Sequence, residues 1–266
     1  MHRNNPAVTF LTDFGLQDTF VGQMKGVALS HCPDAALVDL THGVSPQSIT
    51  EGAYHLAAAW HWFPEGTIHV CVVDPGVGTA RRAIAVNVAG HLFLAPDNSL
   101  LSCVLRSQDV GAAVDLTPDG GEGTYVSRTF HGRDVFARAA GRLAQGAALS
   151  DLGPAIDPND LKRFEPPEPR FETDQITGEI IMVDHWGNAI TNISADQLGG
   201  PDANWSVKCG DLTIAELSST YAAVERGNPV AVISSMDTVE IAVRDGAAAS
   251  RYDLRSGMKV DLKKQL

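Results

Sequence analysis

The segment VVDPGVGTARR, residues 72–82, places an aspartate and an arginine on either side of a turn rich in glycine and proline. The run before the turn, Thr67–Val73, is apolar and β-branched, which predicts a buried strand ending at Asp74. A carboxylate at the carboxyl end of a buried strand lies where open α/β sheets bind ligands, and Arg81 can fold back to pair with it. This pattern indicates a candidate site, although a β-turn with a surface ion pair would explain the same residues.

Three further polar residues lie at the ends of predicted elements in the same half of the chain. Asp13 ends the first predicted strand, His42 follows the second, and His131 begins a predicted helix. Parallel strands end at one edge of their sheet, so we expect Asp13, His42 and Asp74 to converge on one crevice, with His131 facing it.

The same residues leave other interpretations open. Aspartate and histidine at strand ends can ligate a divalent ion, so Asp13, Asp74 and His131 permit a metal site, although no HExxH-like spacing supports one. Asp18 precedes a helical pattern, and on the sequence alone Asp18 or Thr19 is better explained as a helix cap than as a ligand.

The second half of the chain contains one comparable motif, DHWGN at residues 184–188. An exposed Trp186 beside Asp184 and Asn188 suits a flat aromatic ligand, which the ring can stack on and the polar side chains can hydrogen-bond. The alternative is a simple hairpin turn built by Gly187 and Asn188.

The elements that position these residues follow from periodicity and turn signals. In the first half, predicted strands over 7–12, 36–40, 67–73, 83–88, 91–94 and 113–116 alternate with predicted helices, which implies an α/β domain with a mostly parallel sheet and flanking helices. Ser48 and Glu51 predict a capping box for the second helix.

A stretch rich in proline and mixed charge separates the halves, and the helical signal nearly vanishes after it. Predicted strands over 179–183, 189–193, 205–208, 230–233, 239–243 and 259–262 favour a small all-β barrel. We therefore expect an N-terminal α/β domain over residues 1–165, a linker over 166–174 and a C-terminal β-barrel domain over 175–266.

Composition narrows the class of protein. The 266 residues are 44% hydrophobic, which supports a sizeable core, and the net charge of −12 disfavours a nucleic-acid backbone as partner. Four scattered cysteines form no CxxC pair, and no run has the length of a membrane span. We expect a soluble, cytoplasmic protein with reduced thiols that binds neither nucleic acid nor membrane.

Several motifs, in order, resemble the S-adenosyl-L-methionine hydroxide adenosyltransferases, a family of S-adenosyl-L-methionine hydrolases related to the fluorinases and chlorinases. The motifs are TDFG at 12–15, VDPGVGT-x-RR at 73–82, APDN at 95–98, TFHGRD at 129–134, DHWGNAITN at 184–192 and SS-x-x-x-x-EIA at 234–242. The resemblance covers nearly the whole chain.

The resemblance implies an α/β domain joined to a β-barrel in a homotrimer, with each active site between two subunits. It also implies metal-free attack of water or hydroxide on the 5′ carbon of S-adenosyl-L-methionine, with no cofactor, giving adenosine and L-methionine. By this resemblance, the catalytic residues of the hydrolases correspond to Asp74, Arg81 and His131.

The implied substrate-binding residues are divided between the two halves of the chain. Asp13 falls at the ribose hydroxyls, and Asp18, Asp184 and Ser235 fall at the methionine end. Asn188 falls at the adenine edge, with Trp186 and Tyr221 packing on the ring.

The halide-using relatives differ at these positions. The fluorinase has a tyrosine in place of Asp74, and tyrosine and serine in place of His131 and Gly132, so a hydroxyl-lined halide pocket is not expected. Many hydrolases have lysine and phenylalanine where this chain has His185 and Trp186. The alternatives to a metal-free S-adenosyl-L-methionine hydrolase are a halide-dependent adenosyltransferase, a metal-dependent hydrolase and a non-catalytic module that binds a nucleoside or S-adenosyl-L-methionine.

Overall fold

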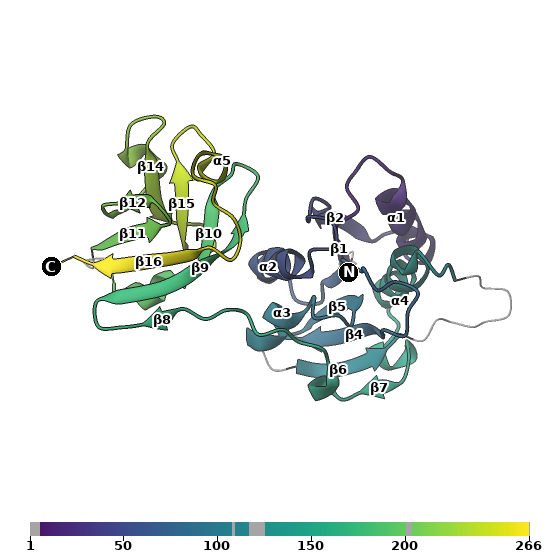
Figure 1. Ribbon diagram of the computed structural model, residues 1–266. Helices are drawn as coiled ribbons and strands as arrows, with labels where there is room; N and C mark the ends of the chain where they lie inside the picture. Colours follow the sequence, from purple (N-terminus) through teal and green to yellow (C-terminus); the bar gives the residue numbers. More distant parts are fainter. Residues whose placement is uncertain (1–5, 108–109, 117–125, 201–203, 266) are drawn as a thin grey trace. The chain divides into compact units, whose positions relative to one another are not determined.

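The computed structural model describes residues 6–107, 110–116, 126–200 and 204–265. The chain divides into two compact units, Met1–Glu165 and Pro166–Leu266 (Figure 1). Among the described residues, each helix is too short or too polar to cross a bilayer.

The first unit is built on one seven-stranded sheet in the order β2-β1-β3-β5-β4-β6-β7. Its strands are β1 (Ala7–Thr12), β2 (Ala36–Thr41), β3 (Ile68–Val72), β4 (Ala83–Val88), β5 (His91–Pro96), β6 (Val110–Asp115) and β7 (Ala155–Ile156). The pairs β1–β2, β1–β3 and β3–β5 are parallel, whereas β5–β4, β4–β6 and β6–β7 are antiparallel. The sheet is therefore mixed rather than mostly parallel, because the short turn between β4 and β5 closes a hairpin and the strands that follow continue antiparallel.

Helices cover both faces of this sheet (Figure 1). They are α1 (Phe20–His31), α2 (Ile49–Ala59), α3 (Ser102–Ser107) and α4 (Arg138–Gln145), the last continuing a π-helical segment, Gly132–Ala137. One apolar core joins the sheet to α1 and α4, and includes Phe10, Met24 and Phe136. A second core lies on the other face and joins the sheet to α2 and α3, with Leu56 and Leu100 among its residues.

Thr19 and Ser48 occupy the N-cap positions of α1 and α2, as predicted, but neither side chain forms a capping bond. Thr19 occupies the N-cap of α1 but makes no side-chain cap bond, and Asp18 lies outside the helix. Helix α2 begins at Ile49 without a capping bond from Ser48; instead, a carboxylate oxygen of Glu51 accepts a hydrogen bond from the Ser45 backbone nitrogen at 3.1 Å. Both helices depend instead on packing of their apolar faces, as most helices in proteins do.

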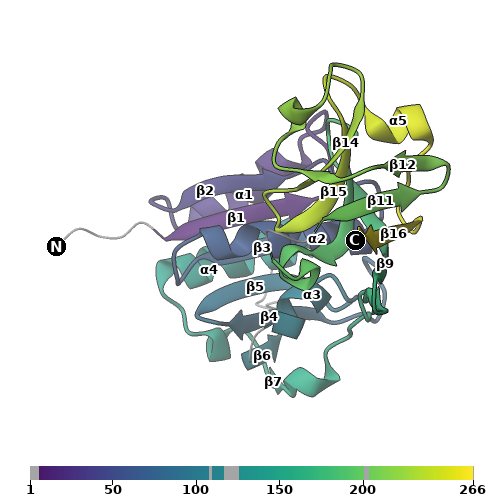
Figure 2. The same ribbon diagram turned by 90° about the vertical axis from the view of Figure 1, so that its left-hand side faces the viewer.

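The second unit is an all-β, barrel-like sheet, with α5 (Ala248–Tyr252) as its one α-helix among the described residues. Its strands, several visible in Figure 2, are β8 (Arg170–Phe171), β9 (Gln175–Val183), β10 (Ala189–Ser194), β11 (Trp205–Cys209), β12 (Leu212–Ile214), β13 (Leu217–Ser218), β14 (Pro229–Ile233), β15 (Thr238–Val243) and β16 (Lys259–Lys264). They pair in the order β12-β11-β16-β9-β10-β15-β14-β13, and β8 pairs with β9. The two ends of the sheet approach each other, with β13 near β11 and β12 near β14.

All six strands predicted in this half are present. The sequence pattern missed β8, β12 and β13, which are only two or three residues long. The expected linker over 166–174 includes β8, which pairs with β9 of the second unit.

Candidate active site

Asp74 and Arg81 form a bidentate ion pair at the carboxyl end of β3. The Arg81 Nε donates to Asp74 Oδ1 at 3.0 Å, and Nη2 donates to Oδ2. The two side chains are only 5% and 6% exposed, so the alternative of a surface ion pair is wrong. Arg81 also lies 5.6 Å from the centroid of the Phe136 ring, which gives the guanidinium a cation–π contact.

His131 is joined to this pair through the same guanidinium. Arg81 Nη2 lies 2.8 Å from His131 Nδ1. A guanidinium can only donate, so Nδ1 accepts and the proton of the neutral imidazole is on Nε2. Burial and the charge of Arg81 lower the pKa of His131, and the carboxylates of Asp74 and Asp134 offset only part of that effect.

A close backbone approach and one hydrogen bond define the turn that carries Asp74 and Arg81. Gly78 has φ +76°, and a Cβ there would lie 2.3 Å from the Arg128 carbonyl oxygen, so only glycine permits this close approach. Asn98 Nδ2 donates to the Val73 carbonyl at 2.8 Å, immediately before Asp74. The APDN motif therefore fixes the end of β3.

Asp13 lies at the neighbouring strand end, as predicted. The parallel pairing of β1 with β3 aligns Thr12 with Val72, which brings the residues after both strands to one edge of the sheet. Asp13 Oδ2 accepts a hydrogen bond from the Gln47 backbone nitrogen at 2.7 Å, and its side chain stays partly exposed.

His42 follows β2 at the same edge, but its buried ring makes structural contacts instead of facing a crevice. Nδ1 lies 2.8 Å from Thr12 Oγ1, and Nε2 lies 2.8 Å from Asp39 Oδ1, while Lys25 Nζ donates to Asp39 Oδ2 at 2.6 Å. Thr12 Oγ1 in turn accepts from the Phe14 backbone nitrogen at 3.2 Å. This Lys25–Asp39–His42–Thr12 network braces the turn that carries Asp13.

The remaining acidic residues of the first unit differ in surroundings. Asp18 is exposed, and no hydrogen bond to its carboxylate is seen within the described residues. Asp134 is buried and accepts two hydrogen bonds from Arg133 and one from the Ser127 backbone nitrogen. These bonds outweigh burial and lower the pKa of Asp134, so Asp134 fixes the segment beside His131.

In the second unit the DHWGN motif forms the turn between β9 and β10. Asp184 accepts from the Asn188 backbone nitrogen at 2.8 Å and from Asn188 Nδ2 at 3.0 Å. Gly187 has φ +82°, and a Cβ there would lie 2.7 Å from Ala247 Cβ, so the turn requires glycine. The hairpin interpretation is correct for the backbone, and it leaves Trp186 73% exposed.

Trp186 and Asn188 line an open cavity of about 880 Å³ within the second unit. Tyr221, from the loop before β14, lines the same cavity, as do Thr220 and Arg244. The structure thus brings together three of the predicted substrate-binding residues around one partly apolar hollow, which suits a planar ligand.

Tyr221 is hydrogen-bonded to Glu240, a residue of the SS-x-x-x-x-EIA motif to which the sequence pattern assigned no role. Its hydroxyl donates to Glu240 Oε1 at 2.7 Å, and Glu240 is only 3% exposed. Burial and the nearby Asp184 raise the pKa of Glu240, and burial and the Glu240 bond raise the pKa of Tyr221 to about 12. One acidic residue inside the apolar run TVEIAV was the available signal.

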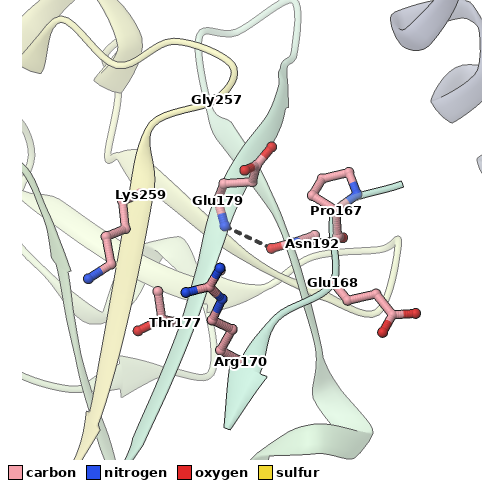
Figure 3. Close-up of a pocket in the computed structure, with 9 residues that line it drawn as sticks. Pro167, Glu168, Arg170, Thr177, Glu179, Asn192, Gly257 and Lys259 are labelled. Carbon is pink, nitrogen blue, oxygen red and sulfur yellow. Dashed lines mark hydrogen bonds between the residues drawn. The ribbon is translucent and has the colours of Figure 1, made fainter. Parts of the chain in front are cut away.

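Ser235 lies in the exposed turn after β14 and does not line this cavity. A second cavity of about 420 Å³, between Pro167, Arg170, Thr177 and Lys259, contains none of the predicted site residues (Figure 3). No cluster of three or more metal-ligating side chains occurs in the parts of the chain that the structure describes.

Comparisons with known proteins match both units. Residues 8–153 match the S-adenosyl-L-methionine hydroxide adenosyltransferase N-terminal domain, and residues 178–261 match the C-terminal domain. The chain belongs to this family. The resemblance predicted from the sequence motifs is therefore confirmed.

Relatives in the family carry two kinds of name. A Salinispora arenicola protein named (R)-S-adenosyl-L-methionine hydrolase is 40% identical over 96% of each chain, and a Thermus thermophilus protein of the same name is 37% identical over 96% of this chain and 98% of its own. A fluorinase from Actinopolyspora mzabensis is 28% identical over 97% of each chain. A Thermotoga maritima crystal structure, of a protein described as uncharacterized and conserved, has a TM-score of 0.89 at 30% identity over 96% of this chain and 99% of that one.

Proposed function

We propose that this family member hydrolyses (R)-S-adenosyl-L-methionine to adenosine and L-methionine. The observation that carries the proposal is the continuous Asp74–Arg81–His131 set at the end of β3. The names of the 37–40% identical relatives support the same substrate and the (R) configuration at sulfur.

In the reaction, a water oxygen bonds to the 5′ carbon while the bond from that carbon to sulfur breaks. Sulfur leaves as the neutral thioether of methionine, so the leaving group needs no general acid. The barrier lies in making a nucleophile from water near neutral pH, which requires stabilisation of developing hydroxide.

Arg81 supplies that stabilisation. Among its five N–H groups, contacts within the described structure engage Nε, both Nη2 hydrogens and, at 3.5 Å, one Nη1 hydrogen. The second Nη1 hydrogen is left to donate to the attacking oxygen. Asp74 holds the guanidinium in place and accepts the proton that the water loses as its oxygen bonds to the 5′ carbon.

His131 orients the water without removing its proton. Because Nδ1 accepts from Arg81, the neutral ring offers Nε2–H as a donor to the water oxygen. We propose in-line placement of this water behind the 5′ carbon as the source of the entropic part of the acceleration.

The substrate-binding roles are proposals from the family resemblance. Asp13 binds the ribose hydroxyls, and Asp18, Asp184 and Ser235 hold the cationic methionine end. Asn188 reads the adenine edge, and Trp186 and Tyr221 pack on the ring; these three already share one cavity.

We further propose that the chain forms a homotrimer with active sites between subunits, which would unite residues of the two units, and that these units are the domains expected from the sequence. Its four cysteines are free thiols, which suits the reducing cytoplasm. The reaction uses no metal.

One incubation tests the function. Purified protein is given each sulfonium epimer of S-adenosyl-L-methionine, with and without chelator and with and without chloride, and the nucleosides are separated by chromatography. Adenosine from the (R) epimer in all four conditions is the expected result. A 5′-chloro nucleoside or loss of activity with chelator would overturn it in favour of the halide or metal alternative, and bound but unreacted substrate would indicate a binding module.

A further inference from the structure

We infer that Glu240 is a positioning residue that holds the Tyr221 ring against the adenine of the substrate. The inference rests on the proposed function, because the adenine site assigned there is the cavity lined by Trp186 and Tyr221. No role for Glu240 follows from the reaction itself.

The loop that carries Tyr221 has few anchors of its own. Tyr221–Ala223 forms a single 3₁₀ turn with exposed residues, and Tyr221 itself is 43% exposed. An exposed aromatic ring without a fixed orientation would lose rotamer freedom each time it packed on a ligand.

Glu240 provides the fixed point beneath this loop. It lies in the middle of β15, paired on one side with Ile190 of β10 and on the other with Val232 of β14. Its carboxylate accepts a hydrogen bond of 2.7 Å from the Tyr221 hydroxyl, and Glu240 itself is only 3% exposed. A hydrogen bond to a carboxylate is among the stronger kinds, and it is strengthened where water is excluded.

Arg244, directly after β15, holds the backbone of the same loop. Arg244 Nη1 donates to the carbonyl oxygen of Val224 at 2.7 Å and to that of Ala222 at 3.3 Å. Val224 also packs on a small apolar cluster formed by Val230, Val232 and Ala242. The backbone is therefore held by Arg244 and by packing, while the Tyr221 ring is held by Glu240.

The test separates ring placement from turnover. Tyr221→Phe and Glu240→Ala are each expected to raise the KM for S-adenosyl-L-methionine about three- to tenfold with kcat within about twofold, because the released ring would lose rotamer freedom each time the substrate binds. The double variant is expected to match either single variant, because both remove one interaction. Glu240→Gln keeps an acceptor and is expected to restore the KM, and Tyr252→Phe serves as the matched control.

Adenosine binding is measured in parallel by quenching of tryptophan fluorescence, with Trp186→Phe identifying the reporter. If wild type fails to turn over S-adenosyl-L-methionine but binds adenosine, the proposed function fails and the titration still tests the pair. An unchanged adenosine Kd in folded Tyr221→Phe, additive effects in the double variant, or no adenosine binding by wild type would each overturn the inference.

Discussion

Arg81 donates from a single nitrogen, Nη2, to both Asp74 and Nδ1 of His131. The two partners depend on each other through one guanidinium, and its planar fork sets the angle between them. The neighbouring Arg82 uses its own fork elsewhere, donating to Asp97 and to the carbonyl oxygen of Asp160.

Arg81→Lys keeps the positive charge but loses the planar guanidinium that donates to both Asp74 and His131. We expect kcat to fall by about 10²–10³-fold with little change in KM, because the lost contacts stabilise developing hydroxide and not bound substrate. Steady-state kinetics check this, with Arg82→Lys as the neighbouring control that lowers stability and leaves kcat within a few-fold. A rise in KM without loss of kcat would contradict the role of Arg81.

Activity should depend on pH through His131. Burial and Arg81 lower its pKa below the ordinary value of 6.5, so the ring is neutral at neutral pH and kcat falls as pH drops through that lowered pKa. Protonation of the ring would place a hydrogen on Nδ1, which could then no longer accept the hydrogen bond from Arg81. His131→Asn keeps an acceptor for Arg81 without a titrating ring, and we expect a slower enzyme whose kcat profile lacks this acid limb. If kcat of the variant still fell at low pH as in the wild type, the fall would belong to another titrating group.

Gly78→Ala should disrupt the turn before Arg81. The added methyl group would meet the Arg128 carbonyl oxygen at a backbone φ of +76°, and we expect a loss of stability on the order of 2–4 kcal/mol. Gly76→Ala is the matched control, because a Cβ there meets nothing closer than 3.6 Å. Urea unfolding of both variants measures the difference. Equal unfolding midpoints would contradict the prediction, because they would show that the turn accommodates the methyl group without loss of stability.

His69 should make the fold sensitive to acid. It is fully buried, lies 2.8 Å from Thr9 Oγ1 and 3.2 Å from His91, and stacks on Phe93. Burial and the neighbouring His91 lower the pKa of His69 from 6.5 to about 3. Below pH 6.5 the unfolded chain therefore binds a proton at His69, whereas the folded chain binds it only near pH 3. The free energy of unfolding falls as the pH drops through this window, by up to about 5 kcal/mol at ~1.4 kcal/mol per pKa unit.

His69→Phe tests that window, because phenylalanine keeps the stacking and cannot titrate. We expect a flatter dependence of unfolding free energy on pH between 6.5 and 4, whatever the variant's stability at pH 7. Parallel slopes in the wild type and the variant would place the acid sensitivity in other residues.

The Asp74–Arg81 pair and the strand end before Asp13 were predicted correctly from the sequence because both features are local. Asp74 and Arg81 are seven residues apart, and Asp13 follows a strand whose boundaries were predicted correctly. The hydrogen bond between Glu240 and Tyr221 could not be predicted from the sequence, because it depends on how a loop folds over β15. The cap positions of α1 and α2 were predicted correctly, but the capping bonds were not, because tertiary packing stabilises these helix starts without side-chain bonds.

The network that braces Asp13 has a consequence for how this chain can vary. Lys25 lies on the surface, yet three side chains connect it to the turn after β1. A change at Lys25 and a change at Asp39 should therefore be epistatic, each tolerated or harmful depending on the other, although neither residue is placed at the substrate. We expect a library that varies Lys25 and Asp39 together to recover active combinations that single substitutions would miss.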